Sequence, residues 1–95
     1  MKRILRLSPQ VIEFAARLAP EPRRALKRAL AGLREGHGDI QALEANLAGY
    51  HRLRVGKYRI IFQYVKDRAI EAVFIEERAL IYDVFEAELV RKLKG

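Results

Sequence analysis

Three arginines, Arg52, Arg54 and Arg59, flank the pair Gly56-Lys57 in a stretch that alternates polar and apolar residues. With Gly56 and Lys57 at the centre of a type II′ turn, Arg54 lies directly opposite Arg59 in a β-hairpin. Because side chains alternate along strands, the three guanidinium groups are predicted to share one face. That face also carries Tyr50, Ile61 and Gln63, and the opposite, core face carries His51, Leu53, Val55, Tyr58, Ile60 and Phe62. A guanidinium stays charged and matches the oxygens of a phosphate, so the first face is suited to a polyanion.

Folding gives no reason for two arginines that face each other across the hairpin. Like charges directly opposite each other destabilise a sheet, on a scale of about 0.2–1 kcal/mol per cross-strand pair. The alternative interpretation is an ordinary solvated face, on which long arginine stems spread apart in water. That alternative is sufficient for any single arginine, whereas three arginines beside Lys57 and the aromatic Tyr50 favour anion binding.

The composition limits the classes of partner. The chain has 95 residues, with 19 Lys and Arg against 12 Asp and Glu, and its net charge is +7. This length predicts a single domain over residues 1–95. The charge favours a nucleic acid, an anionic surface or an acidic protein as partner, although a merely soluble basic protein has the same balance.

The residues that are missing point to a cytoplasmic location. The sequence contains no cysteine, which excludes disulfides and thiolate chemistry and is typical of a reducing cytosol. No apolar stretch approaches the ~20 residues of a spanning helix, and the apolar run at the start is too short for a signal peptide. We therefore expect a cytoplasmic protein without membrane contact.

Hydrophobic periodicity predicts a small α+β domain. Residues 2–7 alternate as a strand does, and Ser8 followed by Pro9 marks a helix start with Ser8 as the N-cap. The predicted order is a strand over 2–7, helices from 9 to about 19 and from about 21 to 34, a polar link over 36–48, a meander of three antiparallel strands over about 50–77, and a helix from about 80 to 94. The two N-terminal helices are expected to form a hairpin that covers the core face of the sheet.

The second turn of the meander decides where a carboxylate joins the arginines. A two-residue loop at Asp67 and Arg68 is preferred, because a loop one residue earlier sets Glu71 opposite Phe62. The preferred register pairs Phe62 with Val73, Ile60 with Ile75 and Arg59 with Glu76. Glu76 is then the only carboxylate on the arginine face, since Glu77 points the other way.

The last helix has one apolar side. Its apolar residues recur at every fourth position, and its cations gather at the C-terminal end, where the helix dipole favours them. The apolar stripe consists of Ile81, Phe85, Leu89 and Leu93.

This order of elements, together with the run Leu-Arg-x-Gly-x-Tyr-Arg at 53–59, resembles the RelE/ParE superfamily of toxins from bacterial toxin–antitoxin systems. The resemblance spans nearly the whole chain and implies a RelE-like fold. RelE-type members cut mRNA in the ribosomal decoding site, ParE-type members poison DNA gyrase, and both are held inactive by an antitoxin that wraps them. A cognate acidic antitoxin is therefore an expected partner, added as a strand at a sheet edge or docked in an apolar groove beside the last helix.

The resemblance also implies roles for particular residues. The basic residues that grip and polarise the scissile phosphate fall at Arg52 and Arg59, with Arg54 beside them, and a further family arginine is matched approximately by Arg78. Two positions depart from the pattern. Tyr50 stands where RelE has a lysine, and Phe85 stands where the family often has a tyrosine that stacks on a base. Core packing is the better interpretation of Phe85, and Tyr82, one turn earlier, is an alternative stacking residue.

Cleavage of RNA by its own 2′-hydroxyl needs a proton acceptor, cations at the phosphate and an acid for the leaving oxygen. Arginine supplies the cations but is a poor base, so Glu76 is the hypothesised base, with a plain ion pair to Arg59 as the alternative. His51 is predicted to pack in the core opposite Phe62, and His37 to lie in a loop. No metal-ligand cluster is visible in the sequence, so no metal or cofactor is expected. The predicted catalytic set is Arg52, Arg59, Glu76 and Arg78, and the predicted RNA-binding set is Tyr50, Arg54, Lys57, Tyr82 and Phe85.

Three functions remain open on this evidence. The first is a RelE-type endoribonuclease that cleaves mRNA on the ribosome and so inhibits translation. The second is a ParE-type gyrase inhibitor that acts by protein contact and needs no catalytic face. The third is a degenerate member that binds RNA or its antitoxin without cutting. The hairpin arginines favour the first, whereas the departures at Tyr50 and Phe85 favour the second.

Overall fold

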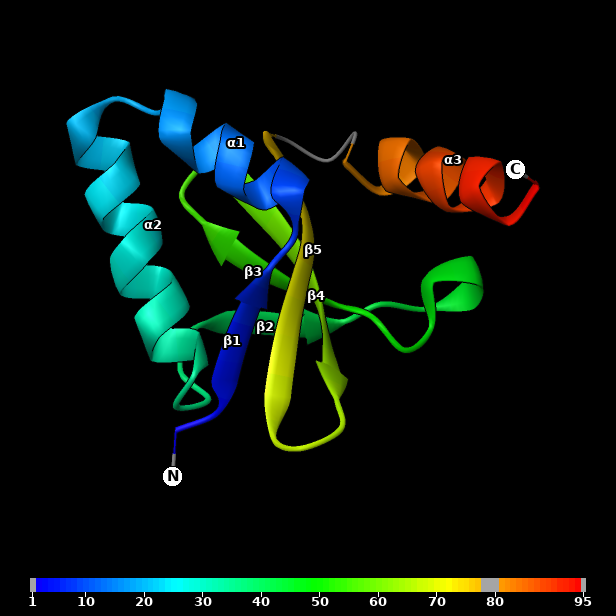
Figure 1. The fold of residues 1–95 in the computed structure, drawn as a ribbon, viewed down its shortest axis with the longest axis horizontal. Helices are drawn as coiled ribbons and strands as arrows, with labels where there is room; N and C mark the ends of the chain where they lie inside the picture. The colour runs from blue at the N-terminus through cyan, green and yellow to red at the C-terminus, as the bar shows by residue number, and fades with distance from the viewer. Residues whose placement is uncertain (1, 78–80, 95) are drawn as a thin grey trace.

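A five-stranded sheet with the strand order β1-β5-β4-β3-β2 organises the chain (Figure 1). The computed structural model describes residues 2–77 and 81–94. Its elements are β1 (Ile4–Leu7), α1 (Pro9–Arg17), α2 (Pro20–Leu33), β2 (Asp39–Ala42), the 3-10 helix η1 (Ala45–Leu47), β3 (His51–Val55), β4 (Tyr58–Val65), β5 (Ala69–Glu77) and α3 (Ile81–Lys94). The predicted α+β class, the helical hairpin, the three-stranded meander and the C-terminal helix are all confirmed.

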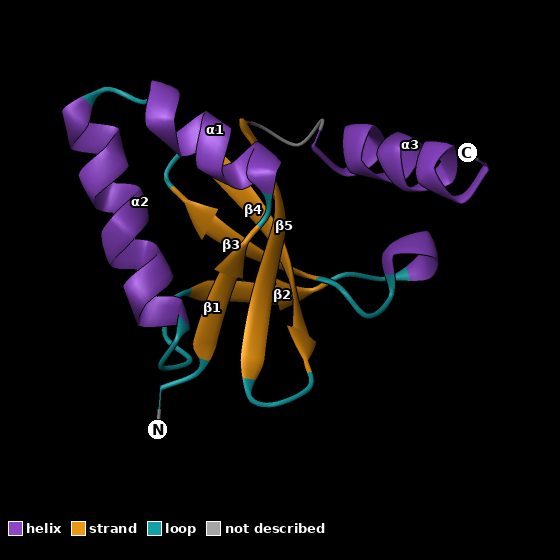
Figure 2. Ribbon diagram, viewed as in Figure 1, coloured by secondary structure: helices purple, strands orange, loops and turns teal. Residues whose placement is uncertain are grey.

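The helices lie on both sides of this sheet. Strand β1 pairs in parallel with β5, so the chain crosses over through α1 and α2 before the antiparallel strands β2 to β5 follow. Figure 2 shows α1 and α2 on one side of the sheet and α3 with η1 on the other. The two faces of the sheet therefore have different neighbours.

Local signals explain where the first helices begin and end. The hydroxyl of Ser8 accepts a hydrogen bond from the backbone N–H of Val11 at 3.2 Å, and Pro9 occupies the first helical position. Leu18 is extended, and α2 begins at Pro20. Gly36, just beyond α2, has φ +81°, the left-handed conformation that commonly ends a helix.

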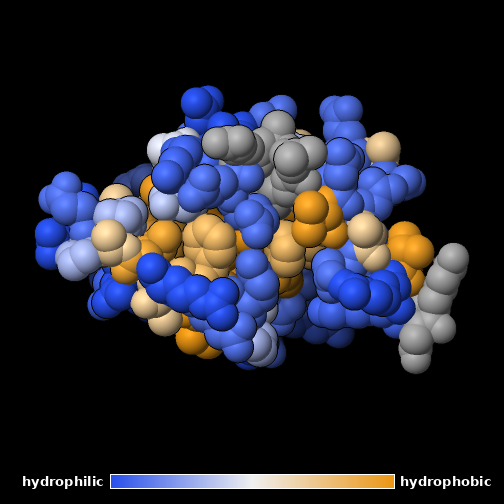
Figure 3. Space-filling view, turned by 90° about the horizontal axis from the view of Figure 1, so that it is seen from above, coloured by the Kyte–Doolittle hydropathy of each residue, from blue (hydrophilic) through white to orange (hydrophobic). Residues whose placement is uncertain are grey.

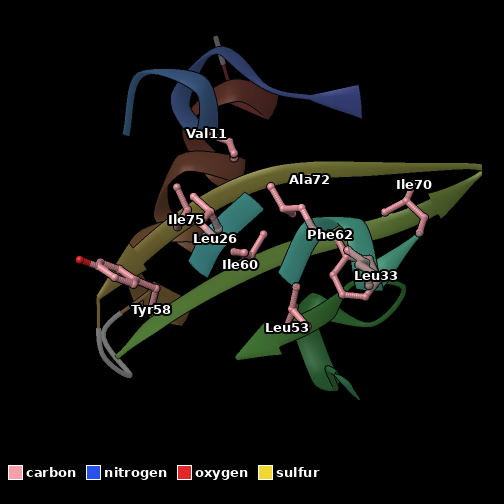
Figure 4. Close-up of a cluster of buried hydrophobic side chains, with 11 residues drawn as sticks. Val11, Leu26, Leu33, Leu53, Tyr58, Ile60, Phe62, Ile70, Ala72 and Ile75 are labelled. Atoms are coloured by element: carbon pink, nitrogen blue, oxygen red, sulfur yellow. The ribbon is translucent and has the colours of Figure 1, made fainter. Parts of the chain in front are cut away.

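The main core lies between this helical hairpin and the sheet (Figure 4). Val11 of α1 and Leu26, Leu30 and Leu33 of α2 meet apolar residues of the strands at 0–8% exposure. The sheet contributes Leu53, Tyr58, Ile60, Phe62, Ile70, Ala72 and Ile75. The residues that alternation assigned to the core face of the hairpin are therefore packed as predicted.

The β3–β4 hairpin has the predicted register at every pair. Val55 lies opposite Tyr58, Arg54 opposite Arg59, and His51 opposite Phe62. Gly56 has φ +58°, whereas the φ of Lys57 is not positive. This combination is the type II′ turn, in which only the first central residue needs the left-handed region.

The second hairpin corrects one predicted pair. Ile60 does pair with Ile75 and Arg59 with Glu76, but Phe62 pairs with Ala72, because a bulge in the register follows Ile61. The expected pair of Phe62 with Val73 was therefore wrong, and so was the two-residue loop, since Val65 pairs with Ala69 across residues 66–68. The bulge changes which side chains face the core. Because of it, Ile70 and Ala72 join the main core, while Glu71 pairs with Gln63 on the other face.

The segment interpreted as a polar link contains a fifth strand. β2 runs antiparallel to β3, with Asp39 opposite Arg54 and Gln41 opposite Arg52, and η1 follows it. Gly38 has φ +135°, and a Cβ at this position would lie 2.7 Å from Cδ1 of Leu53, so a side chain there would clash with the core. This close approach allows β2 to pair with the meander.

A second apolar cluster lies on the face away from α1 and α2. Leu47, Ile61 and Phe85 are buried in it, with Tyr50, Val73, Phe74, Tyr82 and Leu89 packed around them. The predicted stripe of α3 holds for Phe85 and Leu89, but Leu93 is 87% exposed. The helix is therefore packed along its first turns and leaves its last turn in solvent.

Candidate functional site

Charged side chains cross the second face of the sheet in one row. Asp39, Arg54, Arg59 and Glu76 are successive neighbours on β2, β3, β4 and β5. Arg52 lies two residues from Arg54 on β3 and therefore on the same face. We call these five residues the arginine face. The structure thus brings the three hairpin arginines to one face with Glu76 at one end of the row, as predicted. The expectation that Glu76 is the only carboxylate on this face was wrong, because Asp39 of β2 lies at the other end.

Arg52 is largely enclosed, with its side chain only 12% exposed. Its Nη2 donates to Oε1 of Gln41 at 2.5 Å, and its Nη1 lies 3.4 Å from Oδ1 of Asp39. On the other side of Arg52 in register is Ile61, which is fully buried. The stem of Arg52 thus lies beside an apolar residue, while its charged end is held by β2.

Arg59 and Glu76 are neighbours in register but are bonded to backbone. The guanidinium of Arg59 donates to the carbonyl oxygens of Gly56 at 3.0 Å and of Tyr58 at 3.1 Å. A carboxylate oxygen of Glu76 accepts from the backbone N–H of Glu77 at 3.3 Å. The guanidinium of Arg59 therefore folds back over the turn.

Arg54 and Lys57 are the open cations of this region. Arg54 is exposed, and the side chain of Lys57 is 65% exposed while its Nζ lies 3.5 Å from Oε1 of Glu77. The ammonium of Lys57 also lies 5.5 Å from the centre of the Tyr58 ring. Both cations are accessible to an anion that approaches from solvent.

The aromatic residues predicted to bind RNA are packed against one another. Phe85 is 5% exposed, with its ring centre 5.1 Å from that of Tyr50 and 5.7 Å from that of Phe74. Tyr82 packs against the same cluster. Phe85 is therefore a core residue in this conformation, and stacking on a base would require α3 to move. Arg78, the fourth predicted catalytic residue, lies outside the described residues.

A groove of about 430 Å³ lies beside α3, between this helix, the start of α1 and the sheet. Its floor is apolar and includes Val73, Phe74 and Phe85, and its rim carries Gln63, Glu71, Glu88 and Lys92. Figure 3 shows apolar side chains exposed between polar ones along the upper side of the molecule. The groove matches the predicted docking place beside the last helix.

Three residues near the site escaped sequence reasoning. Asp39 and Gln41 contact Arg52 from β2, a strand that was not predicted. Gln10 of α1 accepts from the backbone N–H of Ile75 at 2.9 Å and donates to its carbonyl at 2.8 Å, which secures β5 just before Glu76. The alternation of Asp39-Ile40-Gln41 was the only signal for β2, and it is too short to identify a strand by itself.

His51 packs where alternation placed it. Its ring stacks on Phe62 with 5.4 Å between ring centres and meets the edge of Tyr64 at 5.0 Å. Its Nδ1 is buried and has no hydrogen-bond partner. This histidine faces the core side of the sheet, opposite to the arginine face.

Across residues 2–77 and 81–94, no group of three or more His, Cys, Asp or Glu side chains is placed to hold a metal ion. Within the same ranges, no helix combines the length and apolarity needed to cross a bilayer.

Solved structures of similar shape are toxins of toxin–antitoxin systems. The RelBE2 complex of Mycobacterium tuberculosis has a TM-score of 0.70 at 20% identity and covers 82% of this chain and 100% of that one. The archaeal RelE–RelB complex of Pyrococcus horikoshii has a TM-score of 0.69 at 23% identity, with 83% and 98% covered. The YoeB–YefM complex of Staphylococcus aureus has a TM-score of 0.64 at 21% identity, with 82% and 99% covered.

No family model matches the sequence. No curated protein matches it either. The likeness therefore rests on shape, and it confirms the RelE-like fold that the sequence predicted.

Proposed function

We propose that this chain is the toxin of a toxin–antitoxin pair and that it acts as a RelE-type endoribonuclease on mRNA. The observation that carries the proposal is the arginine face, where Arg52, Arg54 and Arg59 share one side of a RelE-like sheet although cross-strand pairing gives no folding reason to place them together.

In the proposed reaction, Arg59 binds the scissile phosphate and stabilises the charge that develops on its oxygens. Arg52 and Arg54 bind the same phosphate or its neighbour, and Arg78 is proposed as a further cation. Glu76, the neighbour of Arg59 in register, accepts the proton of the 2′-hydroxyl as its oxygen bonds to phosphorus. The bond from phosphorus to the 5′-oxygen breaks, and the leaving 5′-oxygen takes a proton from solvent water. This scheme uses arginine as a cation and leaves removal of the 2′-hydroxyl proton to the carboxylate. It requires no metal or cofactor.

The remaining predicted residues would bind the RNA on either side of the cut. Lys57 and Arg54 offer exposed charge to the backbone of the RNA. Tyr50 and Tyr82 lie beside the packed ring of Phe85, so any stacking on bases would begin from this cluster. The proposed place of action is the ribosome in the cytoplasm.

The proposed partner is an acidic antitoxin. The similar structures RelBE2, RelE–RelB and YoeB–YefM are toxin–antitoxin complexes. This chain has edge strands β1 and β2 for an added strand and the groove beside α3 for a docked segment. Its charge of +7 suits a partner of the opposite sign.

Mapping of transcript ends after expression tests the catalytic proposal. We expect new ends within translated mRNA for the wild type and none for Arg59→Ala. Glu76→Gln should lose cleavage while it retains RNA binding. If Glu76→Gln cleaves like the wild type and Arg59→Ala does not, Glu76 is not the base.

The second candidate is a ParE-type gyrase inhibitor. It is favoured because position 50 lacks the lysine of RelE and because the ring of Phe85 is packed in the core. A supercoiling assay with purified gyrase separates the two functions. Inhibition of supercoiling without new transcript ends would replace the nuclease proposal by this one.

A further inference from the structure

The guanidinium of Arg52 is held by a strand that contributes no residue to the proposed reaction. Gln41 accepts a hydrogen bond from it at 2.5 Å, and the carboxylate of Asp39 lies 3.4 Å away. Both come from β2, where Gln41 lies opposite Arg52 and Asp39 opposite Arg54. The guanidinium of Arg52 is thus fixed from the side that faces away from Arg59.

Packing gives no reason to place a charge here. Arg52 stands between Gln41 and the fully buried Ile61, and its side chain is 12% exposed. Enclosing a charge costs desolvation energy, and an apolar side chain at such a place is often equally stable or more stable. An enclosed arginine with two oriented acceptors is instead what a preorganised anion contact requires.

Asp39 also explains how Arg52 and Arg54 can be close neighbours. Its carboxylate ion-pairs with Arg52 while its backbone lies in register with Arg54. A carboxylate beside the two arginines lowers the net positive charge on this part of the face and so reduces their mutual repulsion. The aspartate side chain is 58% exposed, so it compensates the charge only in part and leaves both arginines attractive to a phosphate.

We propose that Gln41 and Asp39 are positioning residues, which hold Arg52 in the orientation that binds the phosphate of the RNA. This inference rests on the proposed nuclease function. Gln41 fixes the guanidinium plane through its hydrogen bond, and Asp39 keeps the charge of Arg52 beside Arg54. Neither residue touches the reacting atoms, so both act only through Arg52.

The test is a double-mutant cycle on Gln41→Ala and Arg52→Ala. The cleavage rate is measured in a single turnover at saturating RNA, and affinity is measured with a 2′-O-methyl RNA that cannot be cut. Gln41→Ala should lower the rate by about 10- to 100-fold, the scale of a small misplacement, and the affinity by less than about 3-fold. In the Arg52→Ala background the same change should cost nothing further.

Three further variants make the cycle specific. Gln41→Glu keeps an acceptor and should restore most of the rate. Asp39→Asn keeps the shape of the side chain, provides a second route if Gln41→Ala fails to fold, and should lower the rate by a few-fold. Gln63→Ala is the matched control on the same face, because Gln63 donates to Glu71 at 3.1 Å and should leave the rate unchanged.

A second readout separates this inference from the nuclease proposal. The NMR signal of the Arg52 side-chain N–H groups should be sharp and protected from exchange in the wild type and should be lost in Gln41→Ala. An unchanged signal, or a rate loss that persists in the Arg52→Ala background, overturns the positioning role. A wild type that leaves RNA uncut overturns the nuclease function instead, and the NMR signal alone then decides whether Gln41 holds Arg52.

Discussion

The two faces of the sheet follow the same alternation of side chains but differ in composition. The face under α1 and α2 is mostly apolar, and its buried residues are 0–8% exposed. The other face has the small cluster around Phe85 at one end and the charged row around Arg59 at the other. The first face is explained by burial alone. The second is only partly explained by burial, and the unexplained part is where a function has to be sought.

The largest effect on stability is expected from truncating a buried side chain on the apolar face. Phe62→Ala should lower the free energy of unfolding by about 3–5 kcal/mol, because the side chain is fully buried and a cavity remains. Phe74→Ala, on the second face and only partly buried, should cost less. Chemical denaturation of both variants makes the comparison. An equal or larger loss for Phe74→Ala would show that both faces contribute equally to the free energy of unfolding.

The next effect concerns activity on the charged face. Arg59→Ala should lower RNA cleavage by about 10²- to 10³-fold, the usual scale for one lost contact to a developing oxyanion. Its free energy of unfolding should change by less than ~1 kcal/mol, because its hydrogen bonds are to the nearby turn. Arg28→Ala, which removes an exposed arginine of α2, is the control and should cleave normally. Equal losses in both variants would mean that only total charge matters.

A smaller effect is expected at the residue that ties α1 to the sheet. The hydroxyl of Ser8 caps α1 and donates to the carbonyl of Val73 at 2.9 Å, beside the bulge of β5. Ser8→Ala should lower the free energy of unfolding by about 1 kcal/mol, whereas Ser8→Thr retains the hydroxyl and should cost only a few tenths. Thermal or urea unfolding measures both. No difference between the two variants would contradict the capping role.

The smallest effect on stability is expected at Lys57. Its ion pair with Glu77 is exposed, so Lys57→Ala should change the free energy of unfolding by less than about 0.5 kcal/mol. Affinity for uncleavable RNA should fall a few-fold, and the salt dependence of binding should weaken by about one phosphate contact. A salt titration of RNA binding measures this. An unchanged slope would remove Lys57 from the RNA-binding set.

Much of the fold could be predicted because its signals are local. Ser8-Pro9 starts α1, and Gly56-Lys57 sets the turn that places Arg54 opposite Arg59. The bulge after Ile61 was not predictable from turn chemistry, since it results from keeping Ile70 and Ala72 in the core and Glu71 out of it. Strand alternation is a strong signal, but a single inserted residue changes its phase.

The candidate site was predicted only as far as the hairpin extends. The shared face of Arg52, Arg54 and Arg59 follows from one register, and the structure has that register. The contacts of Arg52 with Asp39 and Gln41 depend on β2, whose four residues carry too little pattern to be identified. The burial of Phe85 depends on how α3 lies against the sheet, which periodicity alone does not specify.

The most direct measurement is a paired assay on the variant in which both Arg54 and Arg59 are replaced by glutamine. These arginines lie opposite each other, so their removal should leave the free energy of unfolding unchanged or raise it by a few tenths of a kcal/mol. Cleavage of mRNA by the same protein should be abolished. A variant that still cleaves mRNA would show that these two arginines have no role in the reaction. A variant that unfolds more easily by ~2 kcal/mol or more would show that they stabilise the fold.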